Sequence, residues 1–273
     1  MTIARDEASP DDAGAVPASH SFVVPAYGDS PFLVGCLQSL RDQTARADIV
    51  ITTSTPSPFI DEAARAYSVP VLVNPERGGI AADWNFALAA TDARFVTLAH
   101  QDDVYFPSFL ATTLSLFAGH PNSAVCFTGY QEIGDDGAPV SSKISRVKHA
   151  LERLTLGSRP DVTPGRLRAF LSLGNPLPCS AVTFDRARLG DFAFSDAYAS
   201  NLDWDAWLRL LEQGRRFIRT PERLVGRRHN PLTATSRLIR DGVRQREDLI
   251  MFRRLWPGPL AALIAWAYRA GYG

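Results

Sequence analysis

One stretch of the sequence decides the fold that we predict: Arg94-Phe95-Val96-Thr97-Leu98-Ala99-His100-Gln101-Asp102-Asp103-Val104-Tyr105-Phe106-Pro107. Its apolar run, residues 95–99, has the length and composition of a buried strand. The run ends in His100, Gln101 and two adjacent carboxylates, Asp102 and Asp103. Ligands of open α/β sheets bind just beyond the carboxyl ends of the strands, so we expect a site here.

The two adjacent acids allow two interpretations. Asp102 and Asp103 would repel each other at a strand end unless a cation neutralised them. Oxygen ligands suit Mg²⁺ or Mn²⁺, and such ions commonly bridge to the phosphates of a substrate. The alternative is a solvated turn whose acids cap the next helix. These residues alone leave both interpretations open.

Composition limits the class of protein. The chain has 273 residues and a formal net charge of zero, so no global electrostatic argument favours nucleic-acid binding. Its three cysteines are far apart and form neither a metal-binding pair nor a disulfide framework, which fits a reducing compartment. No signal-peptide core or run of 18 apolar residues is present. We therefore expect a cytoplasmic protein that does not span a membrane.

Strand and helix patterns alternate along the first half of the chain. Residues 1–20 are rich in Ala, Asp, Ser and Pro and predict a disordered tail. Strands are expected at residues 21–25, 48–52, 69–73 and 95–99, with helices at 31–43, 60–67 and 80–91 between them. This alternation predicts an α/β fold with a mostly parallel sheet and helices on both faces.

The second half of the chain is less regular. Helices are expected at residues 107–118 and 164–173, from 201 onward, and at 235–255, followed by a last apolar helix. Strands are expected at residues 123–130, 139–140, 180–184, 217–220 and 224–226. The polar segment 141–165 has weak periodicity, and we expect it to be mobile with a short helix near 150–156.

Five short motifs follow one another over about residues 21–236. They are Val24-Pro25-Ala26-Tyr27, residues 74–85 with Gly78-Gly79 and Trp84-Asn85, His100-Gln101-Asp102-Asp103, Leu202-Asp203-Trp204-Asp205-Ala206-Trp207, and Arg228-His229-Asn230 with Ser236. In this order the motifs resemble the family 2 glycosyltransferases of the GT-A fold. They are similar, respectively, to the family's first strand and donor-base loop, its Asn…Gly…Asn segment, its Asp-x-Asp metal motif, its Glu-Asp-x-Asp-x-Trp base motif and its closing His…Ser pattern. Each motif is degenerate, and the signal lies in their joint order.

The resemblance implies an inverting transfer of a sugar from a nucleotide-diphosphate sugar to a hydroxyl of a glycan, a lipid-linked sugar or a small molecule. It implies a divalent metal, Mn²⁺ or Mg²⁺, held by Asp102 and Asp103 with His229 beside it. Asp203 would be the general base. Its place at a helix start would keep it ionised, because the helix dipole favours a negative charge there.

The resemblance also implies a donor pocket and an acceptor side. Donor-binding candidates are Pro25, Ala26, Tyr27, Thr53, Asn74, Arg77, Gly79, Asn85, Gln101 and Asp102. Acceptor-side candidates are Asn175, Trp204 and Asp205. We accordingly expect a nucleotide-binding half at residues 21–106 and an acceptor and catalytic half at residues 107–236.

Three departures from the family's pattern leave the donor open. A threonine-rich loop, residues 52–55, replaces the acid that often binds the donor base, so base contacts would come from hydroxyls or backbone. His100 replaces the first acid of the metal motif, and Leu202 replaces the Glu before Asp203. A catalytically silent nucleotide-sugar binder is therefore an alternative. A sugar-nucleotide pyrophosphorylase is a weaker one, because it needs a Gly-rich basic loop after the first strand.

Residues 237–273 predict a basic amphipathic extension. Its arginines, Arg237, Arg240, Arg244, Arg246, Arg253 and Arg254, alternate with apolar residues. Such a helix can lie on the surface of an anionic membrane, and we expect the inner face of the membrane here. The apolar residues 260–268 are too few to span a bilayer. The alternatives are a helix packed across the catalytic domain, which is the commoner arrangement, or a homodimer interface.

Overall fold

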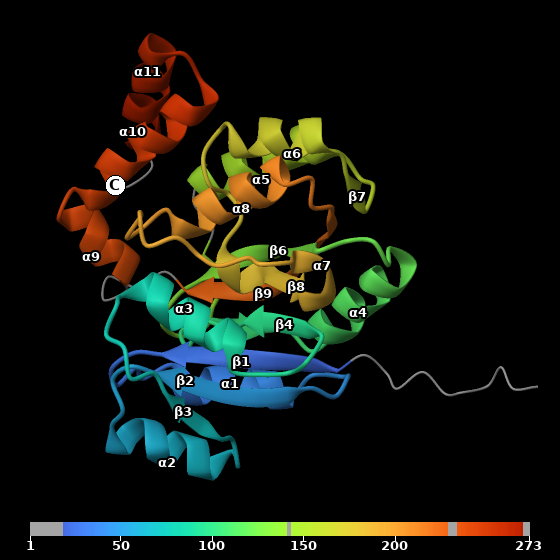
Figure 1. Ribbon diagram of the computed structural model, residues 1–273, viewed down its shortest axis with the longest axis vertical. Coiled ribbons are helices and arrows are strands. Elements are labelled where there is room, and N and C mark those ends of the chain that lie inside the picture. Colours follow the sequence, from blue (N-terminus) through green and yellow to red (C-terminus); the bar gives the residue numbers. More distant parts are fainter. Residues whose placement is uncertain (1–18, 141–142, 229–233, 270–273) are drawn as a thin grey trace, which may run out of the picture.

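The computed structural model describes residues 19–140, 143–228 and 234–269. Within these residues, nine strands form a single mixed sheet with helices packed against it (Figure 1). The fold confirms the predicted α/β class.

The first half of the chain follows the predicted alternation closely. Its elements are β1 (His20–Ala26), α1 (Leu33–Arg41), β2 (Asp48–Thr53), α2 (Pro58–Ala66), β3 (Val71–Val73), α3 (Ile80–Ala89) and β4 (Phe95–Leu98). β1 pairs in parallel with β2 and with β4, and β2 pairs in parallel with β3. The carboxyl ends of these four strands therefore meet at one edge of the sheet.

The second half builds the remaining strands and the helices over them. Its elements are β5 (Val104–Tyr105), α4 (Phe109–Gly119), β6 (Val125–Ile133), α5 (Lys143–Leu156), β7 (Asp161–Val162), α6 (Pro164–Leu171), the 3-10 turn η1 (Cys179–Ala181), β8 (Val182–Asp185), α7 (Arg186–Leu189), α8 (Leu202–Glu212) and β9 (Phe217–Arg228). The spatial order is β3-β2-β1-β4-β8-β6-β9-β5, with β7 also beside β9. β8 runs antiparallel to both of its neighbours, β4 and β6.

Alternation along β1 divides the core between the two faces of the sheet. Phe22 and Val24 join the apolar cluster that α1, α2 and α4 complete. Val23, between them, joins the cluster that contains side chains of α3, α6 and α8. Successive strand residues point to opposite faces, so a strand buried on both sides must be apolar throughout. Both faces are covered, as predicted.

Three expectations about the second half were wrong. The segment 141–165 contains the helix α5 rather than a mostly mobile stretch, and its end is anchored by the fully buried Leu156. The two short strands predicted at 217–226 are one strand, β9, which continues through irregular register opposite Gly129 of β6. The helix predicted at 235–255 is divided into α9 (Ala234–Arg240) and α10 (Val243–Leu255), because Gly242 takes a left-handed φ of 70°.

The C-terminal helices pack on the sheet domain. α10 is followed by α11 (Gly258–Arg269), and the two contact each other as a hairpin. Figure 1 shows them at one end of the molecule's long axis, with α2 at the other end. Among the described helices, none combines the length and hydrophobicity that a membrane crossing requires. Packing on the catalytic domain, one of the alternatives for this segment, is therefore observed.

Gly129 gives a test of the β6–β9 register. A Cβ at this position would lie 2.7 Å from the Pro221 carbonyl oxygen and 2.9 Å from that of Glu222, both of them backbone atoms. Gly129→Ala should therefore lower the free energy of unfolding by about 2 kcal/mol or more, because the backbone must shift. Urea unfolding would measure this, with Gly119→Ala as the control, since a Cβ there meets no atom within 4 Å. Equal stability of the two variants would contradict the bulge geometry.

Candidate active site

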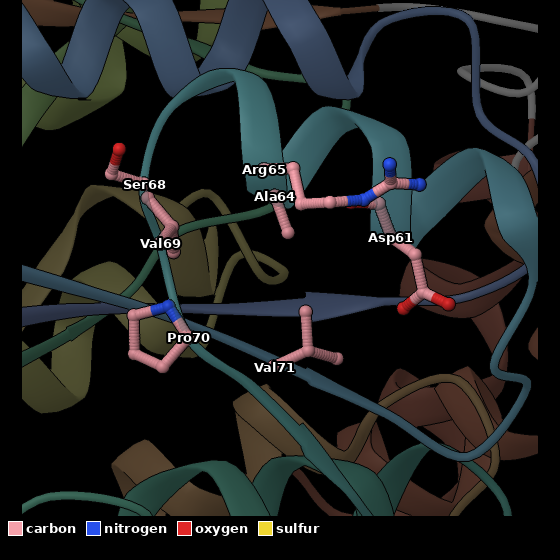
Figure 2. A pocket seen from close by; sticks show the side chains of 7 residues that line it. All are labelled: Asp61, Ala64, Arg65, Ser68, Val69, Pro70 and Val71. Carbon is pink, nitrogen blue, oxygen red and sulfur yellow. The ribbon is translucent and has the colours of Figure 1, made fainter.

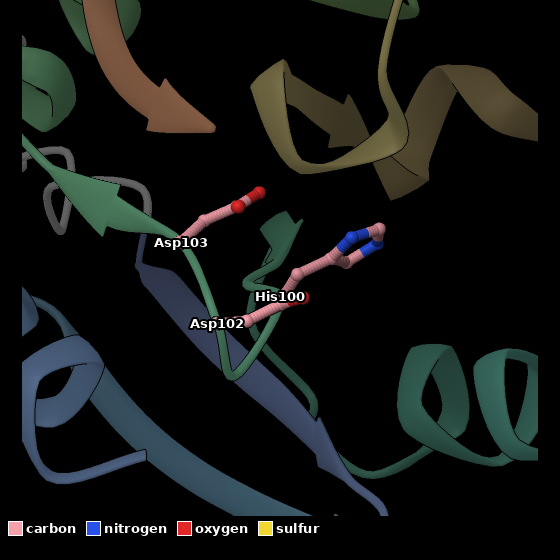
Figure 3. Close-up of side chains that lie close together, drawn as sticks. All are labelled: His100, Asp102 and Asp103. Carbon is pink, nitrogen blue, oxygen red and sulfur yellow. The ribbon is translucent and has the colours of Figure 1, made fainter. Parts of the chain in front are cut away.

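The loop after β4 brings three potential metal ligands together. Ligand atoms of His100, Asp102 and Asp103 lie within 4.8 Å of one another, and Figure 3 shows their side chains on this loop. The loop turns tightly, because the backbone N–H of Asp103 donates to the His100 carbonyl at 3.1 Å. The sequence predicted the two acids at this place but assigned no ligand role to His100.

Arg228, the last residue of β9, anchors this loop from a strand 125 positions away in sequence. Its backbone N–H donates to Asp103 Oδ1 at 2.9 Å, and its Nε donates to the Asp102 carbonyl at 3.0 Å. Its guanidinium also donates to the carbonyls of Gly134 and Asp135, and lies 4.2 Å from the centre of the Phe32 ring. The motif search included Arg228 but gave it no function. His229 and Asn230, which follow it, lie outside the described residues.

Burial dominates the electrostatics of the loop. Burial first, and then the charge of neighbouring Asp102, raise the pKa of Asp103 to about 7. Burial also lowers the pKa of His100, which favours the neutral imidazole. The Nε2 atom of His100 is buried and has no hydrogen-bond partner among the described residues. A neutral imidazole nitrogen without a partner, beside two carboxylates, is a donor set that fits a divalent cation.

Asp203, the predicted base, lies in the first turn of α8. Its Oδ1 accepts the Trp204 backbone N–H at 2.8 Å, and the Asn175 side chain also hydrogen-bonds its carboxylate. Nevertheless, burial raises the pKa of Asp203 above its ordinary value, although the charge of Arg244 lowers it. Burial thus works against the ionised form that the helix dipole was expected to favour, because loss of solvation outweighs the hydrogen bonds.

Asp203 and the loop after β4 face the same region of the molecule. The charge of Asp203 raises the pKa of His100, and the charge of His100 lowers the pKa of Asp203. Such mutual shifts require the two groups to lie near each other. The structure thus brings the predicted base and the predicted metal loop together across the sheet edge.

Two of the three acceptor-side candidates have structural roles instead. Trp204 is fully buried, and its indole N–H donates to the Leu171 carbonyl at 3.1 Å. Both carboxylate oxygens of Asp205 are used, by Arg209 at 2.7 Å and by Arg254 at 2.6 Å. Asn175, through its contact with Asp203, is the candidate of the three that borders the site.

The C-terminal helices complete the surroundings of Asp203. Glu247 of α10 accepts the backbone N–H groups of residues 199–201 at 2.7 to 2.9 Å, just before α8 begins. Asp248 accepts the Asn201 side chain at 2.8 Å. On the other side, the Tyr268 hydroxyl of α11 accepts the Asn175 backbone N–H at 3.4 Å. The sequence did not predict this arrangement, because its partners are distant in the chain.

On the donor side, the structure joins the ends of β1 and β4. The Gln101 side chain accepts the Tyr27 backbone N–H at 3.2 Å and donates to the Tyr27 carbonyl at 3.0 Å. Tyr27 itself is exposed, whereas Ala26 is buried and Pro25 is half-buried. Four residues predicted to bind the donor, Pro25, Ala26, Tyr27 and Gln101, therefore lie together where β1 and β4 end.

An acid that sequence reasoning missed, Asp83, organises the ends of β2 and β3. Its carboxylate accepts Ser54 Oγ at 3.0 Å and Asn74 Nδ2 at 3.0 Å. Thr53, also buried, accepts the Thr55 backbone N–H at 3.0 Å in the same loop. The threonine-rich loop is thus not without an acid, because α3 supplies one. Asp83 follows Gly79 by four residues, a spacing that could have placed it on the exposed first turn of a helix.

Of the remaining residues predicted to bind the donor, two are exposed and one is hydrogen-bonded to another segment of the chain. Arg77 and Gly79 are exposed on the loop before α3, where Gly79 has a φ of 83°. The Asn85 side chain is used elsewhere: it donates to the Phe194 carbonyl at 2.9 Å and accepts the Phe194 N–H at 2.7 Å. Asn85 therefore holds the segment before α8 against α3 rather than pointing to a donor.

One surface hollow lies away from the loop after β4. It has a volume of about 590 Å³ and is lined by side chains of α2 and of the chain leading into β3 (Figure 2). Its lining residues are Asp61, Ala64, Arg65, Ser68, Val69, Pro70 and Val71. None of these was predicted as a site residue, and no metal-binding group of the described residues lies among them. Hollow volume therefore does not locate the chemistry of this fold.

The sheet order and the loop after β4 define a nucleotide-diphospho-sugar transferase fold of the GT-A type. The sequence model described as Glycosyl transferase family 2 matches residues 21–171, more than half of the 273 residues. The chain therefore belongs to glycosyl transferase family 2. Comparison with curated protein sequences gave no significant match.

Solved structures share the fold. Staphylococcus aureus TarS 1–349 in complex with UDP-GlcNAc superposes with a TM-score of 0.61 at 18% identity, covering 80% of this chain and 60% of that chain. The mannosyltransferase PcManGT from Pyrobaculum calidifontis, in complex with GDP-Man and Mn²⁺, gives 0.60 at 16% identity, covering 91% and 73%. A mycobacterial protein gives 0.56 at 14% identity, covering 79% and 69%. This chain thus spans about 60% of the TarS fragment, and at such identities the likeness shows the fold alone.

The buried carboxyl of Asp103 predicts how metal-free stability depends on pH. The pKa of Asp103 is about 4 in the unfolded chain and about 7 in the fold. Its contribution to stability is therefore full below pH 4 and is lost as pH rises through 7. In EDTA at pH 8, Asp103→Asn should therefore raise the free energy of unfolding by about 1 to 3 kcal/mol. Thermal melts at pH 5 and pH 8 would measure this. The gain in the free energy of unfolding should shrink toward pH 5, and the exposed Asp191→Asn control should show no gain. A loss of stability in Asp103→Asn at pH 8 would refute the raised pKa of Asp103.

Glu247 predicts a second effect on stability. Glu247→Gln removes the charge and replaces one carboxylate oxygen by an amide that cannot accept the backbone N–H groups of residues 199–201. We expect a loss of about 2 kcal/mol, because charge-assisted hydrogen bonds are lost and buried N–H groups are left without partners. Chemical unfolding would measure it, with the exposed Glu222→Gln as control. Identical unfolding midpoints for the two variants would show that the α10–α8 contact contributes nothing.

Proposed function

We propose that this chain transfers a sugar from a nucleotide-diphosphate sugar to an acceptor hydroxyl with inversion at the anomeric carbon. The observation that carries the proposal is the meeting of two groups at one sheet edge. The His100, Asp102 and Asp103 cluster lies after β4, and Asp203 at the start of α8 is close enough to exchange pKa shifts with His100. Family membership supports the same reaction class.

Asp102 and Asp103 are the proposed metal ligands, and His100 joins them. Their clustered oxygens and the unpartnered Nε2 of His100 fit Mn²⁺ or Mg²⁺, and the imidazole nitrogen favours Mn²⁺. A bound cation would stabilise the negative charge that the nucleoside diphosphate gains as it leaves. The relative PcManGT is described with GDP-Man and Mn²⁺, which supports this choice. His229 remains a proposed further ligand, although it lies outside the described residues.

Asp203 is the proposed general base. The acceptor oxygen would attack the anomeric carbon from the face opposite the diphosphate while its proton passes to the Asp203 carboxylate. The raised pKa makes this carboxylate a stronger base than an exposed aspartate, which favours proton abstraction near neutral pH. Hydrogen bonds from Asn175 and the Trp204 backbone orient it. Asn175 is therefore the proposed residue that aligns the acceptor with the base.

The proposed donor pocket lies along the ends of β1, β2 and β3. Tyr27 and Gln101 form its rim, and the Thr53 loop with Asn74 and Asp83 forms its floor. The exposed Arg77 is suited to the diphosphate, because a guanidinium binds phosphate oxygens through several donors. TarS was solved with UDP-GlcNAc and PcManGT with GDP-Man, so the fold accommodates donors with different bases.

A catalytically silent nucleotide-sugar binder is the competing proposal. Replacement of two family acids by His100 and Leu202 motivates it. Turnover separates the two: the active enzyme releases free nucleoside diphosphate from a nucleotide sugar in the presence of Mn²⁺ and acceptor. The pyrophosphorylase alternative loses support, because the loop after β1 contains no Arg or Lys.

Asp203→Asn tests the base. The variant should bind nucleotide sugar as the wild type does but lose transfer by about 10²-fold or more, because no group then accepts the hydroxyl proton. Wild-type kcat should fall as pH drops through a pKa above that of an ordinary aspartate, since burial raises the pKa of Asp203. Initial rates between pH 5 and pH 9 would measure both. Asp205→Asn disturbs only structural ion pairs and should leave the shape of the pH profile unchanged. Normal transfer by Asp203→Asn would exclude this base.

Asp102→Ala tests the metal assignment separately. It should abolish the Mn²⁺-dependent part of donor binding, measured by calorimetry with and without EDTA, because a principal ligand is removed. Asp203→Asn should retain that dependence. If both variants bind donor with equal metal dependence, the loop after β4 does not hold the cation.

A further inference from the structure

The helix α11 has an apolar face that nothing in the described structure covers. Its inward side packs through the buried Ala261 and Ala265. Between Pro259 and Tyr268 every exposed position is apolar: Pro259, Leu260, Ala262, Leu263, Trp266 and Ala267. Trp266 is 71% exposed and Leu263 59%. A surface helix normally carries polar residues on its outward face, so this pattern indicates a further contact.

The exposed charges within the α10–α11 hairpin itself, residues 243–269, are all positive. Between residues 243 and 269 the only acids are Glu247 and Asp248, and both are buried. Arg246, Ile250 and Arg253 are exposed at positions four and three residues apart, which places them on one side of α10. Arg269 is exposed at the end of α11. The α10–α11 hairpin therefore combines an apolar face with a basic surface.

We propose that the α10–α11 hairpin docks on the surface of a membrane that carries anionic lipids. α11 would lie in the plane of the interface with Leu263 and Trp266 among the lipid headgroups, since Trp favours that region and twelve residues are too few to cross a bilayer. Arg253 and Arg269 would be attracted by the negative surface potential.

The same charges disfavour a second copy of the chain as the occupant of this face. In a two-fold dimer the hairpin surface meets its own copy, and the exposed charges that the two hairpins bring together are then all positive. Like charges brought together in an interface cost binding energy. An anionic lipid surface complements both the apolar and the basic part of the hairpin.

Docking would also place the proposed site at the membrane. The hairpin contacts the site directly, through Glu247 with residues 199–201 and through Tyr268 with Asn175. A docked chain would hold Asp203 near hydroxyls borne by lipids. This consequence rests on the proposed function, whereas the docking itself does not.

Vesicle flotation of the full chain tests the docking without any assay of transfer. The chain should float with phosphatidylcholine vesicles that contain one third phosphatidylglycerol, and bind at least about tenfold more weakly to pure phosphatidylcholine. High salt should reduce the difference between the two vesicles. Absence of binding to the anionic vesicles would overturn the proposal.

Paired substitutions locate the contact. Leu263→Ser with Trp266→Ser should weaken binding to the anionic vesicles at least about tenfold, because both side chains lose their burial in the interface. Leu154→Ser is the matched control, since Leu154 is 81% exposed on α5. Arg253→Gln with Arg269→Gln should weaken binding to anionic vesicles about tenfold and leave the weak binding to neutral vesicles unchanged. All these side chains are exposed, so unchanged melting temperatures would confirm that each variant is folded.

Trp266→Phe gives a spectroscopic readout. Wild-type tryptophan fluorescence should shift to the blue on binding anionic vesicles, because Trp266 leaves water, whereas Trp204 and Trp207 are fully buried and Trp84 and Trp256 are half-buried. Trp266→Phe should float with the vesicles but lose most of the shift. An undiminished shift in this variant would place the contact elsewhere. A dimer in solution that Leu263→Ser dissociates, with no vesicle binding, would show that a second copy covers the face.

Discussion

Placing carboxylates out of water beside one another is the constraint on which this structure depends. Asp103 is 3% exposed and lies next to Asp102, so burial raises its pKa to about 7. Asp203, on the facing helix, also has a raised pKa because of burial. A buried charge without a partner costs free energy. A cluster of buried carboxylates with raised pKa values therefore indicates a functional site. The surrounding fold supplies hydrogen-bond donors to these acids: Arg228 for the loop after β4, and Asn175 with the Trp204 backbone for Asp203.

Residues from distant parts of the chain hold the site in place, which makes it a product of the whole fold. Arg228 stands at the end of β9 and joins it to the loop after β4. Glu247 and Tyr268 belong to the C-terminal helices, and they hold the chain before α8 and the Asn175 turn respectively. The C-terminal helices therefore support the site as well as presenting an apolar outer face. A site held from several sides keeps its geometry because each supporting residue is itself packed.

The donor side shows the same principle in a different form. In the sequence no acid follows β2 directly. The loop at residues 52–55 was therefore predicted to contact the donor base through hydroxyls or backbone. In the fold, Asp83 reaches that loop from the first turn of α3 and joins Ser54 to Asn74. The replacement could not be seen locally, because residues 54, 74 and 83 become neighbours only when the ends of β2 and β3 meet the first turn of α3. Asn85, by contrast, matched the family's motif, yet both polar groups of its amide bind the Phe194 backbone.

Local pattern in the sequence was sufficient for the alternation of β1 to β4, for the fold class, and for the position of Asp102, Asp103 and Asp203 at element ends. These features follow from hydrophobic periodicity and helix-start chemistry, which act over a few residues. Tertiary structure alone decided the continuous strand β9, the antiparallel insertion of β8, the ligand role available to His100, and the structural use of Trp204 and Asp205. It also decided the direction of the Asp203 pKa, because desolvation depends on every residue that excludes water from the group and not on its neighbours in sequence.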